Sequence, residues 1–463
     1  MGLFDDFNPV SSKAWKQKIQ YDLKGADYNN ILVWNSKDGI DVKPFYHADQ
    51  FEDFLKVPKR SEKHWNICQT VFVADVKKSN KKAKDLISRG ANAIRFIITS
   101  RDLDVKALLK DIDVQHLLLY IECQFLSKEF IENFQRTYVE LSNSPELDQL
   151  YFDLDIIGRL AKTGNWFHTL QSDHEEFGEI LDISKSFSVD CRLYQNAGAT
   201  IVQELAYAMA HCNEYFNHLD ADVSEEKKEQ IRVVFKSSVG SNYFFEIAKL
   251  RALRLLFASL ASEYGFNPDC HIVATPSKRN KTLYDYNVNM LRTTTECMSA
   301  VLGGADTVNN LAYDAIYHKD NEFGERISRN QLLILKEESY FDAVNNPADG
   351  AYYIESLTED FATKALELFK DIERNGGFLN QLKGGTIQKK IKESAEKEQQ
   401  LVDSEQMVLV GTNKYPNADD RMTNELELYP FVKINPVKTL IEPIIEKRLS
   451  ESLEKKRLKN END

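Results

Sequence analysis

The sequence predicts an α/β protein built on a (β/α)8 TIM barrel, because short β-branched runs alternate with longer helical patterns along most of the chain. The connections between the expected strands are long enough for the crossover helices that parallel strands require. With 463 residues, the chain has room for a barrel of about 250 residues and for extensions at both ends.

The expected strands are short runs rich in β-branched and aromatic residues. In chain order they are Val71–Val76, Ile94–Thr99, His116–Glu122, Leu150–Asp155, Val189–Tyr194, Ile231–Lys236, Cys270–Ala274 and Asp306–Leu311. The helical patterns between them cover Ser79–Ser88, Lys128–Leu141, Ile201–Leu219, Tyr243–Glu263 and Asn289–Leu302. Ser79 suits the N-cap of the first helix, where its hydroxyl would accept a hydrogen bond from a free backbone N–H.

The helix expected over Tyr243–Glu263 is apolar on almost every side. Packing against a barrel covers one face of a helix, so the rest of this apolar surface needs a second cover. That cover is either a second subunit or the long helices expected after Tyr353. We favour the second subunit.

These patterns divide the chain into a partner-contacting arm (residues 1–64), the barrel (65–352) and C-terminal helices with a linker (353–463). Two charged helices are expected around the glycine pairs Gly376-Gly377 and Gly384-Gly385. They are expected to pack outside the barrel.

The arm and the tail each carry a helical pattern of apolar residues. In the arm the pattern consists of Trp15, Ile19 and Leu23 at fourfold spacing, and a strand and turn are expected from Gly39 onward. The tail Thr439–Lys456 shows the same spacing, with Pro443 in the first turn, where proline is tolerated. We therefore expect one amphipathic helix in each segment.

Composition and charge narrow the range of partners. The chain has 59 basic and 72 acidic residues, a formal net charge of −13, which disfavours nucleic acid or an anionic membrane. No apolar run reaches the roughly 18 residues of a membrane span, and Met1–Asp6 lack a signal-peptide pattern. The six cysteines stand far apart, as is typical of reduced thiols. We expect a cytoplasmic protein.

The segment Leu193–Thr200 reads Leu-Tyr-Gln-Asn-Ala-Gly-Ala-Thr. It resembles the Tyr-His-Met-Gln-Glu-Ala-Gly-Ala segment of adenosylcobalamin-dependent acyl-CoA mutases, the methylmalonyl-CoA mutase family. Other segments resemble that family in the same order between about Trp65 and Tyr415. They begin at Ser238 (Ser-Val-Gly-Ser-Asn-Tyr-Phe-Phe-Glu-Ile-Ala-Lys), Leu291 (Leu-Arg-Thr-Thr-Thr-Glu-Cys-Met-Ser-Ala-Val-Leu-Gly-Gly), Arg326, Asn346 and Gly411 (Gly-Thr-Asn-Lys-Tyr).

The resemblance implies two catalytic positions that this chain has replaced. In the family, the His of the first segment faces the substrate thioester and the cofactor, and the Tyr of Trp-x-Ile-x-Gln-Tyr wedges against the cofactor. Here Leu193, preceded by Arg192, stands at the His position, and Thr70 stands at the Tyr position. A hydrocarbon side chain cannot donate a proton or a hydrogen bond to a carbonyl. We therefore expect no catalytic residue in this chain.

Two loops at the barrel mouth also depart from the family pattern. The family's Arg-x-His-x-Gln-Thr-Ser-Gly-Trp is replaced at His271–Arg279, and its Thr-Gln-Ser-Leu-His-Thr-Asn is replaced at Ala305–Leu311. Barrel enzymes keep their chemistry at this mouth, so scaffold positions survive while chemical positions are lost. The family's Asp-x-His-x-x-Gly motif, whose His binds cobalt from below, is absent from the sequence. We expect no flavodoxin-like cobalamin-binding domain, no cofactor and no metal bound by this chain alone.

Four other constellations have structural interpretations that we prefer. His211 and His218 lie two helical turns apart, too far to share a metal, and Asp173–Glu176 is expected to be a solvated loop. Asp153 and Asp155 are expected to point to the same side of a strand end as a structural or vestigial pair. Lys278, Arg279 and Lys281 either grip a CoA phosphate or form an exposed basic loop, and we favour the loop.

The resemblance implies the small subunit of an adenosylcobalamin-dependent methylmalonyl-CoA mutase, which interconverts methylmalonyl-CoA and succinyl-CoA. This chain would be non-catalytic and would support a large catalytic subunit, which carries the cofactor, in a one-to-one heterodimer. One alternative is an active acyl-CoA mutase barrel that uses a separate cobalamin-binding subunit, although Leu193 and Thr70 argue against it. Another is a free-standing binding protein on an inactivated barrel, specific for an acyl-CoA.

Overall fold

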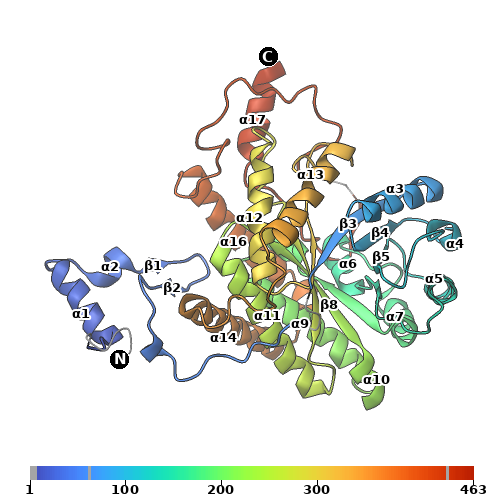
Figure 1. The fold of residues 1–463 in the computed structure, drawn as a ribbon, viewed down its shortest axis with the longest axis horizontal. Helices are drawn as coiled ribbons and strands as arrows, with labels where there is room; N and C mark the ends of the chain where they lie inside the picture. The colour runs from blue at the N-terminus through green and yellow to red at the C-terminus, as the bar shows by residue number, and fades with distance from the viewer. Residues whose placement is uncertain (1–7, 61–63, 434–436, 463) are drawn as a thin grey trace.

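The computed structural model describes residues 8–60, 64–433 and 437–462. Met1–Asp6, on which the signal-peptide prediction rests, lie outside the described residues. A central sheet holds eight strands: β3 (Asn66–Val73), β4 (Ala93–Ile98), β5 (Leu118–Cys123), β6 (Leu150–Phe152), β7 (Ser186–Asp190), β8 (Arg232–Val239), β9 (Cys270–Pro276) and β10 (Thr307–Asn309). Helices surround this sheet on its outer side (Figure 1).

The sheet is a nearly closed parallel barrel. Its strand order is β6-β5-β4-β3-β10-β9-β8-β7, and neighbouring strands in this order pair in parallel. At the seam, the backbone N–H of Ser188 on β7 donates to the carbonyl of Leu154 after β6 at 3.0 Å. The (β/α)8 fold that the sequence predicts is confirmed.

Crossover helices alternate with the strands. They and the shorter mouth helices are α3 (Val76–Ser88), α4 (Val105–Leu108), α5 (Lys128–Ser142), α6 (Ile156–Thr163), α7 (Leu170–Ser184), α8 (Arg192–Ala197), α9 (Ile201–Leu219), α10 (Glu225–Gln230), α11 (Tyr243–Tyr264), α12 (Val288–Leu302) and α13 (Glu322–Leu333). The N-cap of α3 is Asp75, whose side chain accepts from Lys78 N, so the prediction of Ser79 is wrong. The helix begins earlier than its apolar pattern, and Ser79 is buried inside it.

The strand predicted over Val189–Tyr194 is also wrong in its second half. β7 ends at Asp190, and α8 begins two residues later. Asp190 Oδ1 accepts from the backbone N–H of Arg192, which favours a turn at this point over a continued strand. The first part of the segment that resembles the mutase family therefore forms a short helix at the barrel mouth.

The helix α11 is covered by another part of the same chain, which corrects our preference for a second subunit. A long helix, α14 (Tyr352–Arg374), packs along it. The Phe245 and Phe361 rings meet edge to face at 5.2 Å, and Arg251 donates to Glu355 at 2.8 Å. The apolar stripe of α14 supplies the second cover that α11 requires.

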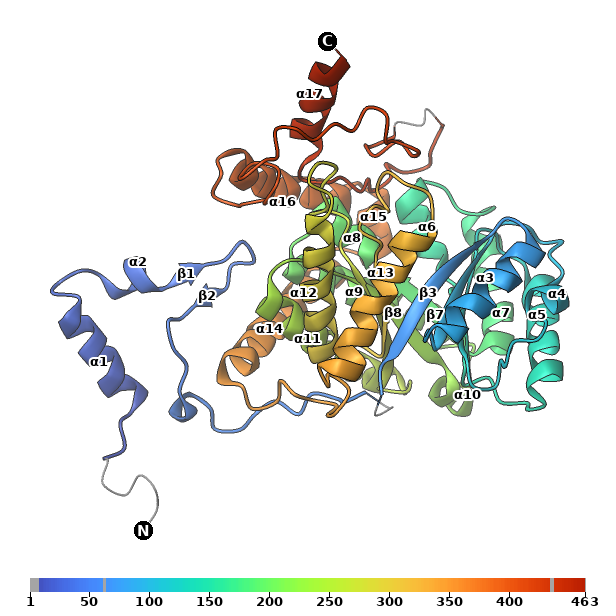
Figure 2. The same cartoon turned by 45° about the horizontal axis from the view of Figure 1, so that its top comes forward.

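The C-terminal part lies over the barrel mouth (Figure 2). After α14 come α15 (Phe378–Lys383) between the two glycine pairs, α16 (Thr386–Asp403), and a final helix, α17 (Glu451–Asn462). We call residues 438–450 the strap. It is extended, so the helix predicted over Thr439–Lys456 is wrong for most of its length.

The strap is not helical because its backbone bonds to the barrel mouth. The N–H groups of Leu440 and Ile441 both donate to Gly164 O, and that of Ile444 donates to Ala161 O. Further along, Lys447 N donates to Asn196 O and Leu449 N donates to Arg279 O. A Cβ at Gly164 would lie 2.7 Å from Ile441 O, so only glycine permits this approach.

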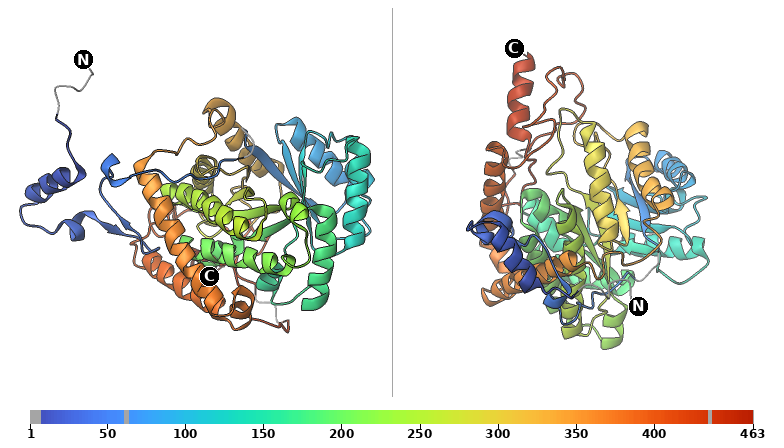
Figure 3. Two further views of the ribbon diagram at one scale, coloured as in Figure 1. Left: turned by 90° about the horizontal axis from the view of Figure 1, so that it is seen from below. Right: turned by 60° about the vertical axis from the view of Figure 1, so that its left-hand side comes forward.

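The N-terminal arm projects away from the body (Figure 3). It contains α1 (Ser12–Asp22), α2 (Tyr28–Leu32), a short hairpin of β1 (Trp34–Asn35) and β2 (Asp41–Val42), and a 3-10 turn, η1 (Ala48–Gln50). The helix around Trp15 and Ile19 and the strand after Gly39 are confirmed. No residue of α1 is buried.

The remaining physical expectations concern membranes and cysteines. Among the described residues, no helix is long and apolar enough to cross a membrane. All six cysteines are free, and five of them are buried.

Candidate functional site: the barrel mouth

A network of charged side chains fills the barrel interior at the C-terminal ends of the strands. At its centre is Lys236 of β8, whose Nζ lies 3.2 Å from Asp153 Oδ2, 3.6 Å from Asp190 Oδ2 and 3.7 Å from Glu122 Oε2. Four of the barrel strands or their ends thus converge on one ammonium group.

Two arginines complete this mouth network. Arg192 of α8 donates to both carboxylate oxygens of Asp190, at 2.8 and 2.6 Å. Arg95 Nε of β4 lies 3.4 Å from Glu122 Oε2. Three cationic side chains therefore face three carboxyl groups.

This pairing fixes the protonation states of the network. Burial alone would raise the pKa of Glu122, but Arg95, Lys236 and Arg192 outweigh it and hold the pKa at about 2. Burial lowers the pKa of Lys236, yet Asp153, Asp190 and Glu122 bring it above its usual value. Efficient proton transfer near neutral pH requires a pKa near 7, so neither group is suited to it. Asp153 differs, because burial raises its pKa.

A second polar cluster lies deeper in the barrel. The hydroxyl of Tyr120 bonds with His271 Nε2 at 2.6 Å and with Thr307 Oγ1 at 2.7 Å. Burial lowers the pKa of His271 to about 4, so this imidazole is neutral at physiological pH. Below it the Tyr120 and Tyr151 rings stack at 5.6 Å. These side chains close the barrel axis.

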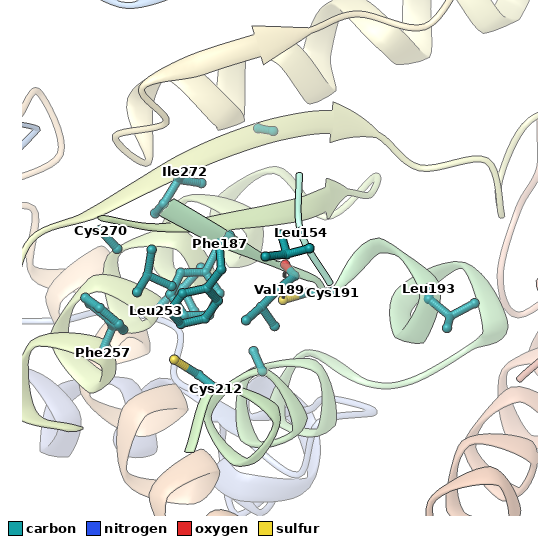
Figure 4. Close-up of a cluster of buried hydrophobic side chains, with 14 of the residues drawn as sticks. Leu154, Phe187, Val189, Cys191, Leu193, Cys212, Leu253, Phe257, Cys270 and Ile272 are labelled. Carbon is teal, nitrogen blue, oxygen red and sulfur yellow. Dashed lines mark hydrogen bonds between the residues drawn. The ribbon is translucent and has the colours of Figure 1, made fainter. Parts of the chain in front are cut away.

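The two replaced family positions have ordinary local partners. Leu193 is 5% exposed and lines the mouth cavity. Figure 4 shows it on the α8 turn, apart from the packed group that includes Phe187 and Val189. Thr70 accepts a hydrogen bond at 3.0 Å from Asn309 Nδ2. Neither position presents an imidazole or a phenol to the mouth.

A cavity of about 450 Å³ remains beside the mouth network. Its walls come from the ends of β5 and β6 and from α6, with Phe125, Leu126 and Phe167 on the apolar side and Arg159 and Lys162 on the basic side. Arg159 stacks on the Phe167 ring at 4.2 Å. The cavity is amphipathic and lies next to Leu193.

The loop after β9 corrects our preference for an exposed basic loop. Arg279 and Lys281 are 5% and 1% exposed, because the strap and α16 cover them. Arg279 donates to Glu398 Oε2 at 2.5 Å and to Lys447 O at 2.8 Å, and Lys281 pairs with Glu296 at 2.7 Å. Of the three basic residues, Lys278 alone is exposed.

The acidic pair after β6 does not share one side, which is a second correction. Asp153 points to Lys236, whereas Asp155 caps α6 through Gly158 N at 2.7 Å and pairs with His211 at 3.0 Å. The strand ends at Phe152, so strand alternation no longer applies. Tyr194 O–H bonds to the other nitrogen of His211 at 2.9 Å, which makes His211 a core residue, as expected.

The segment Asp173–Glu176 is likewise not a loop. It lies in α7, where buried Asp173 accepts hydrogen bonds from the backbone N–H groups of Phe167 and His168. His211 and His218 both lie on α9, as predicted. No cluster of metal-ligating side chains occurs in residues 8–60, 64–433 and 437–462.

Sequence reasoning missed the mouth network. A usable signal was present: Lys236 follows the apolar run Val233–Phe235 in its strand, and Arg95 lies between Ile94 and Phe96. A charged residue in a strand that is buried on both faces needs opposite charges nearby. The sequence does not say which carboxylates supply them.

Comparison with known proteins now identifies the family. A family model described as methylmalonyl-CoA mutase matches residues 104–454. The chain belongs to the methylmalonyl-CoA mutase family. It is 34% identical to the "Methylmalonyl-CoA mutase small subunit" of Porphyromonas gingivalis, over 91% of this chain and 73% of that protein.

Two further relatives bear on the arrangement of the family. The "Methylmalonyl-CoA mutase large subunit" of Porphyromonas gingivalis is 34% identical over 50% of this chain and 33% of its own length. The "Methylmalonyl-CoA mutase" of Cereibacter sphaeroides is 28% identical over 87% of this chain, which spans 64% of that relative. One organism thus has both a small and a large subunit.

Proposed function

We propose that this chain is the small, non-catalytic subunit of a cytoplasmic, heterodimeric methylmalonyl-CoA mutase. The large subunit would hold adenosylcobalamin and interconvert methylmalonyl-CoA and succinyl-CoA. The family membership and the presence of a small and a large subunit in one related organism support this assignment.

The side chains at the barrel mouth support a non-catalytic role. Its central ammonium group, Lys236, is surrounded by three carboxylates, and Leu193 offers no proton at the position where the family uses His. Catalytic groups must be free to bind tighter to the transition state than to the ground state. Charges that satisfy one another contribute to the fold instead.

The residues at the mouth also do not fit adenosylcobalamin. The strap and α16 cover the loop after β9, so Ser277 and Arg279 are nearly inaccessible. A large planar cofactor on this face would have to displace that cover. We therefore assign no reaction step to this chain through the cofactor.

The exposed side chains of the arm favour binding to a partner protein. Trp15, Tyr21 and Ile31 are 50%, 79% and 57% exposed on a segment that projects from the body. Exposed large apolar side chains on a projecting segment are typical of a surface that contacts another protein. We propose that residues 1–64 form the arm that contacts the large subunit, beside the barrel of residues 65–352 and the C-terminal helices and linker of residues 353–463.

Co-expression with the large subunit tests this function. We expect a one-to-one complex in sedimentation, mutase activity in the complex, and none in the chain alone. Equilibrium dialysis of the chain alone should show no adenosylcobalamin binding. A well-behaved monomer that ignores the large subunit, or micromolar cobalamin binding by the isolated chain, would overturn the proposal.

A further inference from the structure

The cavity beside the mouth network extends into the helix layer outside the barrel. Tyr120 points into the barrel, where its hydroxyl meets His271 and Thr307, so its neighbour Ile121 on β5 points outward. The apolar lining comes from this outward side of the strands, from α5 and α7 and from the loop between β5 and α5, and it includes Ile121, Leu126, Ile131, Phe152 and Ile180. All of these belong to the core cluster between strands and helices, and none to the cluster inside the barrel. The apolar part of the cavity therefore lies off the barrel axis.

Two cations of α6 line the same cavity. Arg159 and Lys162 are three residues apart and so share one side of the helix. Lys162 is exposed, whereas Arg159 is half-buried and stacks on the Phe167 ring. A guanidinium group has five N–H donors, and none of those of Arg159 bonds to a described residue, including the buried Nε. Since buried donors nearly always have a partner, Arg159 has hydrogen-bonding capacity left for a ligand.

Carboxyl groups also line the cavity, but each has a partner of its own. Three of them face Lys236 and the fourth pairs with His211; they are Glu122, Asp153, Asp190 and Asp155. Outside the lining, Asp173 acts on Arg159, but its two oxygens already accept from backbone N–H groups. Within the part of the chain that the structure describes, Arg159 and Lys162 are thus the cations of this lining without an ion pair.

We propose that this cavity binds a monocarboxylate with an apolar chain, such as a medium-chain fatty acid. Arg159 and Lys162 bind the carboxylate, because charge-assisted N–H donors match its oxygens, and the chain lies between the strands and the helices. The cavity volume of about 450 Å³ is within the roughly 300–1,000 Å³ of small-molecule sites. An acyl thioester along the barrel axis is a different ligand, because the stacked Tyr120 and Tyr151 rings close that axis.

The test is isothermal titration calorimetry of the full chain with octanoate, for which we expect one site per chain. Butanoate is four methylenes shorter, and each buried methylene strengthens binding by up to about fourfold. Octanoate should therefore bind at least about tenfold tighter than butanoate. Octan-1-ol keeps the chain and lacks the charge, so it should bind at least about tenfold more weakly than octanoate. No saturable binding, or equal affinity for octan-1-ol and octanoate, would overturn the proposal.

Variants of α6 assign the charge. Arg159→Met keeps an apolar contact with Phe167 and removes the guanidinium, so octanoate affinity should fall at least about tenfold, while that for octan-1-ol should change little. Lys162→Gln, at an exposed position, should give a smaller loss and keeps the test decisive if the first variant does not fold. The matched control is Arg136→Met, because Arg136 is an exposed arginine of α5 outside the cavity. An equal loss in this control, or unchanged affinity in both α6 variants, would contradict the site.

Methyl NMR locates the chain of the bound octanoate. Signals of Ile131 and Ile180 in the helix layer should shift on saturation, and those of Val234 and Val273 inside the barrel should not. Shifts confined to the two valines would place the ligand on the barrel axis and overturn the proposal.

These experiments need neither the large subunit nor turnover, and the inference does not rest on the proposed function. If octanoate binds as expected but the chain does not bind the large subunit, the site stands and the proposed function fails. If the complex forms but octanoate does not bind, only this inference fails.

Discussion

The two extensions of the barrel use apolar residues in opposite ways. The C-terminal strap buries Ile441, Ile444 and Leu449 against the mouth of its own barrel. The arm helix α1 buries none of its residues, although Trp15 and Tyr21 are large and apolar. The strap completes this chain, and the arm presents a surface that this chain does not cover.

Breaking the strap should produce the largest effect. Arg279→Met removes the guanidinium that joins Glu398 of α16 to Lys447 O of the strap. It leaves Glu398 with fewer partners in a buried position, so we expect a loss of about 3–5 kcal/mol in the free energy of unfolding. Urea denaturation measures this loss.

The matched control is Lys392→Met, whose pair with Glu442 is more than half exposed. Exposed pairs contribute at most about 1 kcal/mol, so this variant should stay close to wild type. Similar losses in both variants would show that the strap is not held by its buried contacts.

The stability of the covered body should depend on pH through one buried carboxyl group, Glu204. Burial beside Glu246 raises the pKa of Glu204 to about 7 despite Lys249. The folded state therefore binds a proton more tightly than the unfolded state, so its stability falls as pH rises from about 4.5 to about 7. The loss is of the order of 3 kcal/mol at most.

The difference between wild type and E204Q isolates this group. The variant keeps a neutral side chain, so the gap between the two unfolding free energies should change with pH across that window. A gap that does not change with pH would show that Glu204 stays in one protonation state throughout.

Returning the family's imidazole should cost stability and give no activity. Leu193→His places a polar ring at a position that is 5% exposed. If it finds no partner, the cost is about 1–3 kcal/mol. Together with Thr70→Tyr, which loses the bond from Asn309, it should leave the turnover of the complex at or below wild type. A rise towards two active sites per heterodimer would contradict this.

Changes in the arm should have the smallest effect on the chain itself. The double variant Trp15→Ala, Tyr21→Ala alters only exposed side chains, so the unfolding free energy should change by less than about 0.5 kcal/mol. Affinity for the large subunit should fall by at least about 1 kcal/mol, as for aromatic anchors of an interface. Unchanged affinity in a titration would remove the arm from the proposed interface.

The barrel was predictable because its signals are local. Apolar runs such as Ile94–Thr99 and the helix from Tyr243 follow directly from residue periodicity. The strap was not predictable in this way, since Ile441, Ile445 and Leu449 have helical spacing, yet Leu440 and Ile441 bond to Gly164, far away in sequence. Tertiary hydrogen bonds overrode a local pattern.

Of the candidate site, the sequence could predict only which catalytic positions of the family are replaced. Leu193 and Thr70 could be identified by resemblance, and the covered loop and the mouth network could not. Whether Arg279 is exposed depends on Glu398 and Lys447, and neither is near it in the chain.

One carboxylate has a consequence for the order of folding during synthesis. Glu398 accepts from Lys37 at the tip of the arm hairpin, 361 residues earlier in the sequence. At roughly 5–20 residues per second, the ribosome needs on the order of 20–70 s to add that stretch. The hairpin therefore emerges long before its contact with Glu398 can form, which gives a nascent arm time to meet another polypeptide before that contact fastens it.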